Sequence, residues 1–220
     1  MAEYGIIVKW YHSLFGTKER GVSSWYQDHY NKRNIMKIAI TGHAQGIGKS
    51  LTQIYQKNGH TVIGFSRSNG FDISEPAARE QIVIASQECD MFINNAYSRK
   101  GGNFAQVELL FDIWESWKNQ HKTILNISSS ITEKWQTNHP IIAYRVSKQA
   151  LENACEFLYN HSQWPAVSIV SPCLTDTPPH INNPATNKVN PDDLAELVYQ
   201  TMSRRDCRVQ SLKLAIAPTE

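Results

Sequence analysis

The stretch that decides the fold is Met36–Ser50, MKIAITGHAQGIGKS. Its apolar run Lys37–Thr41 predicts a buried strand, and a helix is expected over Gly48–Asn58. Between them, glycine allows a tight turn and lets the backbone approach a pyrophosphate, while the helix N-terminus supplies free N–H groups. An ordinary strand–helix loop would also fit a glycine turn, so the motif needs further support as a nucleotide site.

The spacing of the glycines separates two kinds of phosphate-binding turn. A Walker A loop needs a glycine five residues before Gly48-Lys49-Ser50, but His43 occupies that position and Gly42 comes one residue too early. The observed order is Gly42-x-x-x-Gly46-x-Gly48, which also differs from the common Rossmann fingerprint. A P-loop phosphotransferase is therefore kept only as a third hypothesis.

Short apolar runs alternate with longer helical segments from Met36 onward. This alternation predicts an α/β fold with a parallel sheet covered on both faces. Right-handed crossovers make it a Rossmann-like, doubly wound, three-layer αβα domain that binds its ligand at the carboxyl ends of the strands. Strands are expected at Lys37–Thr41, Thr61–Ser66, Met91–Ile93, Thr123–Ser128, Ala166–Ser171 and near Leu212–Ile216, and helices at Gly48–Asn58, Glu75–Ser86, Phe104–Lys118, Ile142–Tyr159 and Pro191–Ser203.

Length and composition indicate one core and a separate N-terminal segment. A chain of 220 residues with 41% hydrophobic residues suits a single domain. We assign residues 36–220 to it and residues 1–35, which lack strand–helix alternation, to an extension of uncertain structure that cofactor binding does not need.

Charge and cysteine content narrow the class of protein. With 22 basic and 20 acidic side chains, the net charge of +2 gives no reason to expect nucleic acid or an anionic membrane as partner. No apolar run is long enough to span a membrane. No CxxC pair occurs, so no metal site is predicted, and scattered single cysteines indicate reduced thiols in the cytoplasm. The four are Cys89, Cys155, Cys173 and Cys207.

Three further motifs follow the glycine turn. Asn94–Tyr97 has the sequence NNAY, Tyr144–Lys148 has YRVSK, and Ser171–Thr177 has SPCLTDT. Alone, each has an ordinary explanation, such as an Asn-rich turn or a surface pair on a helix. In this order and at these strand ends, they resemble the classical short-chain dehydrogenase/reductase family, from Met36 to roughly Pro218.

The resemblance implies a catalytic set. Tyr144 would act as general acid or base, and Lys148, four residues later on the same helical face, would lower its pKa and bind the nicotinamide ribose. The family's serine is the second of a pair closing a strand, which selects Ser129 and leaves Ser128 and Ser130 as register alternatives. Asn103 would complete a proton relay by anchoring a water near the lysine.

The resemblance also implies which residues contact a nicotinamide dinucleotide. Asn94-Asn95-Ala96 would line the adenine ribose side, and Thr175 and Thr177 would hold the carboxamide. Asp72-Ile73 matches the family pair that touches the adenine ring. The cofactor-binding set is Gly42, His43, Gln45, Gly46, Ile47, Gly48, Ser66, Arg67, Asp72, Ile73, Asn94, Asn95, Ala96, Tyr144, Lys148, Pro172, Thr175 and Thr177.

The end of the second strand predicts NADP(H) in preference to NAD(H). An acidic residue there would bind a free ribose hydroxyl pair, but none occurs before Asp72. Ser66 and Arg67 instead suit an extra ribose phosphate, with His43 as a further contact. A solvated loop arginine is the alternative explanation of Arg67.

These expectations describe an oxidoreductase that transfers a hydride between nicotinamide and a small carbonyl or alcohol substrate. The rival hypothesis is a non-catalytic dinucleotide sensor, because Tyr97 and Cys173 replace two glycines of the family pattern. A small buried side chain is expected for Cys173. Family members often pair through the helices matching Phe104–Lys118 and Ile142–Tyr159, which implies a homodimer or homotetramer.

Overall fold

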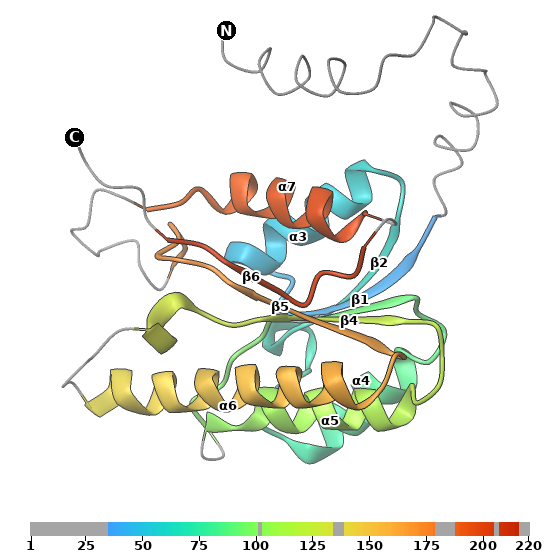
Figure 1. The fold of residues 1–220 in the computed structure, drawn as a ribbon, viewed down its shortest axis with the longest axis horizontal. Coiled ribbons are helices and arrows are strands. Elements are labelled where there is room, and N and C mark those ends of the chain that lie inside the picture. Colours follow the sequence, from blue (N-terminus) through green and yellow to red (C-terminus); the bar gives the residue numbers. More distant parts are fainter. Residues whose placement is uncertain (1–34, 101–102, 134–138, 179–187, 205–206, 216–220) are drawn as a thin grey trace, which may run out of the picture. The chain divides into compact units, whose positions relative to one another are not determined.

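The computed structural model describes residues 35–100, 103–133, 139–178, 188–204 and 207–215. They form one six-stranded sheet in which every neighbouring pair is parallel, with the strand order β2-β1-β3-β4-β5-β6. The predicted doubly wound αβα fold is confirmed (Figure 1). The strands are β1 (Lys37–Thr41), β2 (Thr61–Phe65), β3 (Met91–Asn94), β4 (Thr123–Ile127), β5 (Ala166–Ser171) and β6 (Ser211–Lys213).

Helices cover both faces of the sheet. On one face lie α3 (Gly46–Lys57) and α7 (Pro191–Met202), and on the other lie α4 (Pro76–Ala85), α5 (Ala105–Ser116) and α6 (His139–His161) (Figure 1). The predicted start of α7 is confirmed, since the Asn190 side chain accepts a hydrogen bond of 2.8 Å from the Asp192 N–H and Pro191 holds the first helical position. None of the described helices is both long and apolar enough to cross a membrane.

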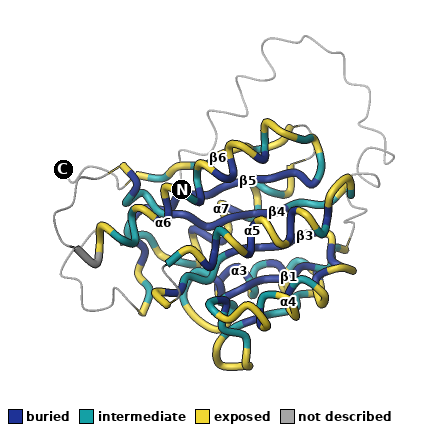
Figure 2. Tube along the Cα trace, turned by 90° about the horizontal axis from the view of Figure 1, so that it is seen from below, coloured by how far each residue is buried: buried dark blue, intermediate teal, exposed yellow. Residues whose placement is uncertain are grey.

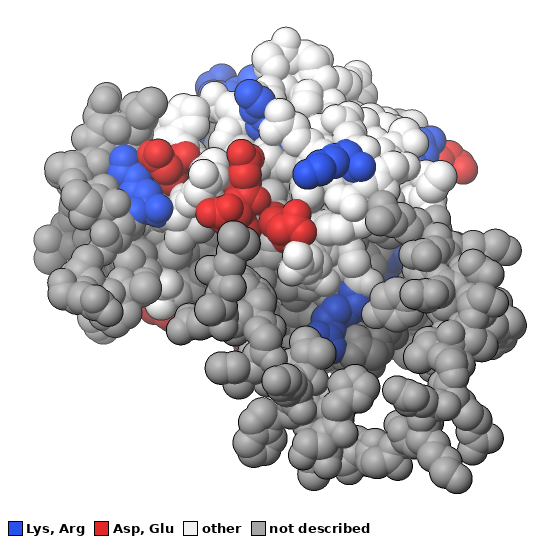
Figure 3. Space-filling model, turned by 90° about the horizontal axis from the view of Figure 1, so that it is seen from above, with Lys and Arg blue, Asp and Glu red and all other residues white. Residues whose placement is uncertain are grey.

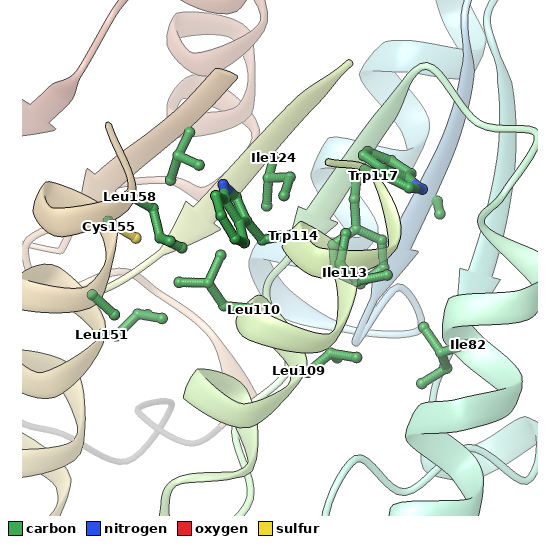
Figure 4. Packing of buried hydrophobic residues seen from close by; sticks show 14 of the residues in the cluster. Ile82, Leu109, Leu110, Ile113, Trp114, Trp117, Ile124, Leu151, Cys155 and Leu158 are labelled. Atoms are coloured by element: carbon green, nitrogen blue, oxygen red, sulfur yellow. The ribbon is translucent and has the colours of Figure 1, made fainter. Parts of the chain in front are cut away.

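Two hydrophobic cores lie on the two faces of the sheet, because side chains alternate along each strand. In β1, Ile38 and Ile40 join the core under α3 and α7, while Ala39 joins the core under α4, α5 and α6. The four inner strands β1, β3, β4 and β5 are buried almost throughout, whereas the edge strands β2 and β6 are partly exposed (Figure 2). In the second core, Leu110 and Trp114 of α5 pack toward α6 (Figure 4).

The C-terminal strand begins and ends earlier in the chain than the sequence predicts. It was expected near Leu212–Ile216, but the pairing residues are Ser211–Lys213, and Ile216 lies outside the described residues. As a three-residue edge strand with two exposed positions, β6 has too little apolar pattern to fix its bounds. The proposed extension over residues 1–35 also lies outside the described residues, apart from Ile35.

The strand order locates the ligand edge. From β1 the chain crosses to β2 on one side, and β3 then pairs with β1 on the other side, so the order reverses between β1 and β3. Ligands of open parallel sheets bind at such a switch point, beyond the carboxyl ends of the strands. On the face that α3 and α7 cover, basic and acidic side chains lie interspersed, in keeping with the balanced composition (Figure 3).

Candidate functional site

The glycine turn connects β1 to α3 at the switch point. Gly42 and Gly46 have φ values of 72° and 54°, in the left-handed region that favours glycine. A Cβ on Gly48 would lie 2.2 Å from the Gly42 carbonyl oxygen, so only glycine fits there. The N-cap residue Gln45 makes no side-chain capping bond. The first N–H groups of α3 therefore face this turn as a place for an anion.

The Asn-Asn-Ala motif fastens β3 to that turn. The Asn95 side-chain amide donates to the Thr41 carbonyl at 3.0 Å, and the backbone N–H groups of Asn95 and Ala96 both donate to Thr41 Oγ1 at 3.0 Å. Asn94 is buried and its amide donates to Asn126 Oδ1 at 3.0 Å. The motif thus ties together the carboxyl ends of β1, β3 and β4.

The SPCLTDT motif reaches the same place from β5. A Cβ on Gly46 would lie 3.2 Å from Thr177 Cγ2, so Thr177 lies directly against the glycine turn. The Pro172 carbonyl accepts a 2.8 Å bond from the Ser130 N–H, which joins this segment to the end of β4. Thr175 Oγ1 donates to the Cys173 carbonyl at 2.9 Å, and Cys173 is buried. The turn and the β5 segment are brought together from opposite halves of the chain.

Tyr144 and Lys148 occupy one face of α6, as the spacing of four predicts. The Lys148 Nζ lies 5.6 Å from the centroid of the Tyr144 ring. Burial raises the pKa of Tyr144 to about 12, while a hydrogen bond with the Ser129 side chain lowers it. The phenol is therefore protonated at neutral pH, and its pKa lies above the ordinary value of 10.0 and not below it, as was expected from Lys148.

The lysine itself is held by buried oxygen atoms. Its Nζ donates to Gln106 Oε1 at 2.7 Å and to the Ile127 carbonyl at 2.8 Å. Burial lowers the pKa of Lys148 to about 7, against the charge of Glu152, which raises it. The amine is thus poised to titrate near neutral pH, within a network that joins α5, β4 and α6.

The contacts favour Ser129 among the three candidate serines. Ser128 Oγ donates to Glu152 Oε1 at 2.9 Å, so that hydroxyl points away from Tyr144. The Ser130 N–H is bonded to Pro172. Ser129 is the serine that interacts with the Tyr144 phenol, in the position that the sequence selected.

Solved structures with a similar fold are numerous. The 3-alpha-hydroxysteroid dehydrogenase from a Pseudomonas species, complexed with NADH, is 21% identical over 81% of this chain and 94% of its own, with a TM-score of 0.69. A short-chain dehydrogenase from Burkholderia cenocepacia in complex with NADP is 16% identical over 82% and 88%, also at 0.69. The chain has the short-chain dehydrogenase fold. No protein-family model and no curated protein matches it.

A third neighbour carries the same likeness. The 3-ketoacyl-(acyl-carrier-protein) reductase from Brucella melitensis, complexed with NADH, is 18% identical, covers 81% of this chain and 96% of its own, and has a TM-score of 0.67. The resemblance drawn from the motifs is therefore confirmed at the level of the fold.

Two residues of this short-chain dehydrogenase fold were missed by the sequence analysis. Gln106, at the start of α5, bonds Lys148 and also donates to the carbonyls of Asn94 and Ile127, at 2.7 and 3.0 Å. Glu152 Oε1 accepts from three hydroxyls, at 2.7 to 3.2 Å. These three hydroxyls belong to Ser128, Thr132 and Ser171. Glu152 lies one helical turn after Lys148, and this spacing could have identified it as a neighbour of the lysine. No local sequence pattern distinguishes Gln106.

Asn103 bonds a tyrosine, and a glutamine contacts the lysine. The Asn103 Oδ1 accepts a 2.9 Å hydrogen bond from the Tyr97 hydroxyl, and the side chain of Gln106, in the first turn of α5, bonds Lys148. The expected role of Asn103, which is to anchor a water near Lys148, stays a prediction.

The end of β2 lies at the outer side of the ligand edge, where the carboxyl ends of the strands meet, and we call it the β2 corner. The His43 ring packs over Gly64, where an added Cβ would lie 2.2 Å from the ring, and its Nδ1 has no hydrogen-bond partner among the described residues. Ser66 Oγ bonds Ser68 Oγ at 2.7 Å, and the Arg67 side chain is exposed. The turn is joined to this corner, since the Gly42 N–H donates to the Phe65 carbonyl at 2.6 Å.

The predicted adenine pair divides between surface and core. Asp72 accepts a 2.7 Å bond from Ser74 Oγ, which lowers its pKa, and lies 3.5 Å from the Lys100 amine. Ile73 is 3% exposed and belongs to the core under α4 and α5. A ligand at this corner would therefore meet the Asp72 side chain and the backbone of Ile73.

Proposed function

We propose that this protein is an NADP(H)-dependent oxidoreductase that transfers a hydride between nicotinamide and a small carbonyl or alcohol substrate. The observation that carries the proposal is the placing of Ser129, Tyr144 and Lys148 at the same sheet edge as the glycine turn. The described residues fit a dinucleotide, because Gly48 allows the tight turn, in which a Cβ would meet the Gly42 carbonyl oxygen, and the start of α3 is uncapped. Neighbours of the same fold are complexed with NADH and with NADP.

The residues divide the work of such a reaction. A bound nicotinamide cofactor supplies the hydride. Tyr144 donates its phenolic proton to the carbonyl oxygen, and its raised pKa keeps that proton in place at neutral pH, which favours the reducing direction. Ser129 donates a hydrogen bond to the same oxygen as negative charge develops. Lys148 binds the nicotinamide ribose and returns a proton toward Tyr144.

The preference for NADP(H) rests on the end of β2. The Arg67 side chain is exposed and makes no hydrogen bond or ion pair with the described residues, so its guanidinium is available to a ribose phosphate. Ser66 and His43 lie in the same corner, and the carboxylate of Asp72 is already engaged by Ser74 and Lys100. A guanidinium matches phosphate oxygens in a bidentate way that a hydroxyl pair does not offer.

The direct test is calorimetric binding of NADPH, NADH and ATP, followed by NADPH oxidation against aldehydes, ketones and quinones. The proposal expects NADPH to bind more tightly than NADH and at least one carbonyl to be reduced. NADPH binding with no turnover across the panel would favour the sensor hypothesis. ATP binding in place of NADPH would favour a phosphotransferase.

We also propose that the protein works in the cytoplasm as a homodimer or homotetramer. The outer faces of α5 and α6 carry exposed apolar side chains, Phe111, Val146 and Phe157, which are 39%, 51% and 61% exposed. Apolar side chains gathered on two adjacent helices are typical of a subunit contact. Light scattering on the purified chain gives the mass, and a monomer at micromolar concentration would contradict this part.

A further inference from the structure

Tyr97 stands among the reacting side chains, although the resemblance expects a glycine there. Its ring meets the Tyr144 ring edge to face, with centroids 4.8 Å apart and planes at 75°. The Lys148 Nζ lies 5.6 Å from the centroid of each ring. One aromatic side chain from the end of β3 is thus in contact with both residues that the proposed chemistry uses on α6.

The Tyr97 hydroxyl is anchored by a hydrogen bond. It donates to Asn103 Oδ1 at 2.9 Å, while burial, the largest effect, raises its pKa and the Ser147 side chain lowers it. Asn103 has a φ of 70°, a left-handed conformation that asparagine tolerates better than most residues. Ser147 lies between Tyr144 and Lys148 on α6, so the anchor fixes the Tyr97 ring against that face of the helix.

We propose that Tyr97 is a positioning residue that holds the Tyr144 phenol in its reactive orientation and excludes water from the space between Tyr144 and Lys148. This inference rests on the proposed hydride transfer and adds a residue that the family pattern does not supply. Edge-to-face contact and the nearby lysine cation both favour the observed ring orientation. A displacement of about 1 Å at a reacting group costs on the order of a hundred-fold in rate.

The kinetic test compares Tyr97→Phe and Tyr97→Ala with a matched pair at Tyr199. Tyr199 on α7 makes the same kind of contact with Tyr55, at 5.2 Å and 80°, on the other face of the sheet. We expect Tyr97→Ala to lower kcat by about ten- to hundred-fold with KM for NADPH nearly unchanged. Tyr97→Phe keeps the ring and most of kcat, while Tyr199→Phe and Tyr199→Ala leave kcat unchanged.

A second measurement needs neither cofactor nor substrate. Tyrosine labelled with carbon-13 at Cζ reports each phenol by NMR, and Tyr144→Phe assigns the Tyr144 signal. The described side chains that interact with this phenol include Ser129 from the loop after β4, Tyr97 from the segment after β3 and Lys148 from α6. Tyr97→Ala admits water, so the pKa of Tyr144 falls from about 12 toward its ordinary value of 10.0. Tyr97→Phe keeps the burial, which is the largest cause of the raised pKa, and removes only the smaller electrostatic effect of the Tyr97 hydroxyl, so most of the rise remains.

The outcomes separate this inference from the proposed function. Wild-type protein that reduces no carbonyl would sink the proposed function, and the NMR titration would then decide the role of Tyr97 alone. A wild-type kcat in Tyr97→Ala, or an unchanged titration of Tyr144 in that variant, overturns the inference. If Tyr97→Ala does not fold, Tyr97→Leu replaces it, since leucine retains apolar bulk without the ring, and the same two outcomes decide.

Discussion

The glycine turn and the inner face of α6 serve the same sheet edge by different physical means. The turn is built from backbone: two left-handed glycines, a third that no Cβ could replace, and the uncapped start of α3. The α6 face is built from buried polar side chains, among which Lys148 bonds Gln106 and a carbonyl from β4. Binding therefore depends on local geometry, whereas the proposed chemistry depends on tertiary contacts.

This difference separates what each kind of substitution should change. A substitution on the α6 face should alter turnover and the pKa values of Tyr144 and Lys148, while leaving the glycine turn and its affinity for the dinucleotide unchanged. A substitution in the turn should weaken binding while leaving the pKa values of Tyr144 and Lys148 where they are.

The largest effect is expected for Tyr144→Phe. The ring still packs, but the proton donor is gone, so single-turnover reduction should slow by about 10²- to 10⁴-fold. Calorimetry should find NADPH binding nearly intact. Wild-type rates in this variant, on a substrate verified with the wild type, would show that Tyr144 is not the acid.

The burial of Lys148 predicts a dependence of stability on pH. Its pKa is lowered from an ordinary 10.5 to about 7, so the unfolded state binds more protons between these values. Wild-type unfolding free energy should then rise by up to about 1.4 kcal/mol per pH unit from this group between pH 8 and 10. Denaturant titrations should show that the unfolding free energy of Lys148→Met depends less on pH than that of the wild type. Parallel dependence on pH in the two proteins would contradict a lowered pKa of the buried Lys148.

A methyl group in the turn should weaken binding without touching the chemistry. In Gly48→Ala the added carbon meets the Gly42 carbonyl oxygen, a backbone atom that moves only with the turn. We expect NADPH affinity to fall by about ten- to hundred-fold, taking 1–3 kcal/mol for overpacking. Wild-type NADPH affinity in Gly48→Ala would remove the turn from the site.

The smallest effect is expected at the exposed corner. Arg67→Ala should weaken NADPH binding by roughly five- to hundred-fold and leave NADH nearly unchanged, because NADPH alone carries the ribose phosphate. Added salt should erode the NADPH advantage by screening. Titration of both cofactors into both proteins, at low and high salt, measures this. An equal loss of affinity for both cofactors would mean that Arg67 supports the fold or the adenine pocket.

The same division explains what could be predicted from the sequence. The strands β1 and β5 match their predicted bounds, because uninterrupted apolar runs leave little choice. The glycine turn was recognisable because its φ values require glycine. Gln106 and the placing of Asn103 were not predictable, since they depend on where α5 begins relative to a lysine on another helix. A contact of that kind leaves no periodic trace along the chain.

The most direct test of hydride transfer follows a deuterium label from the cofactor to the product. NADPH deuterated at the transferred position of the nicotinamide is incubated with wild-type protein and a carbonyl panel, and the alcohols are analysed by mass spectrometry. The account predicts deuterium on the carbinol carbon with wild-type protein and almost none with Tyr144→Phe, although both bind NADPH. NADPH that binds to the wild type but delivers deuterium to none of the carbonyls would contradict it.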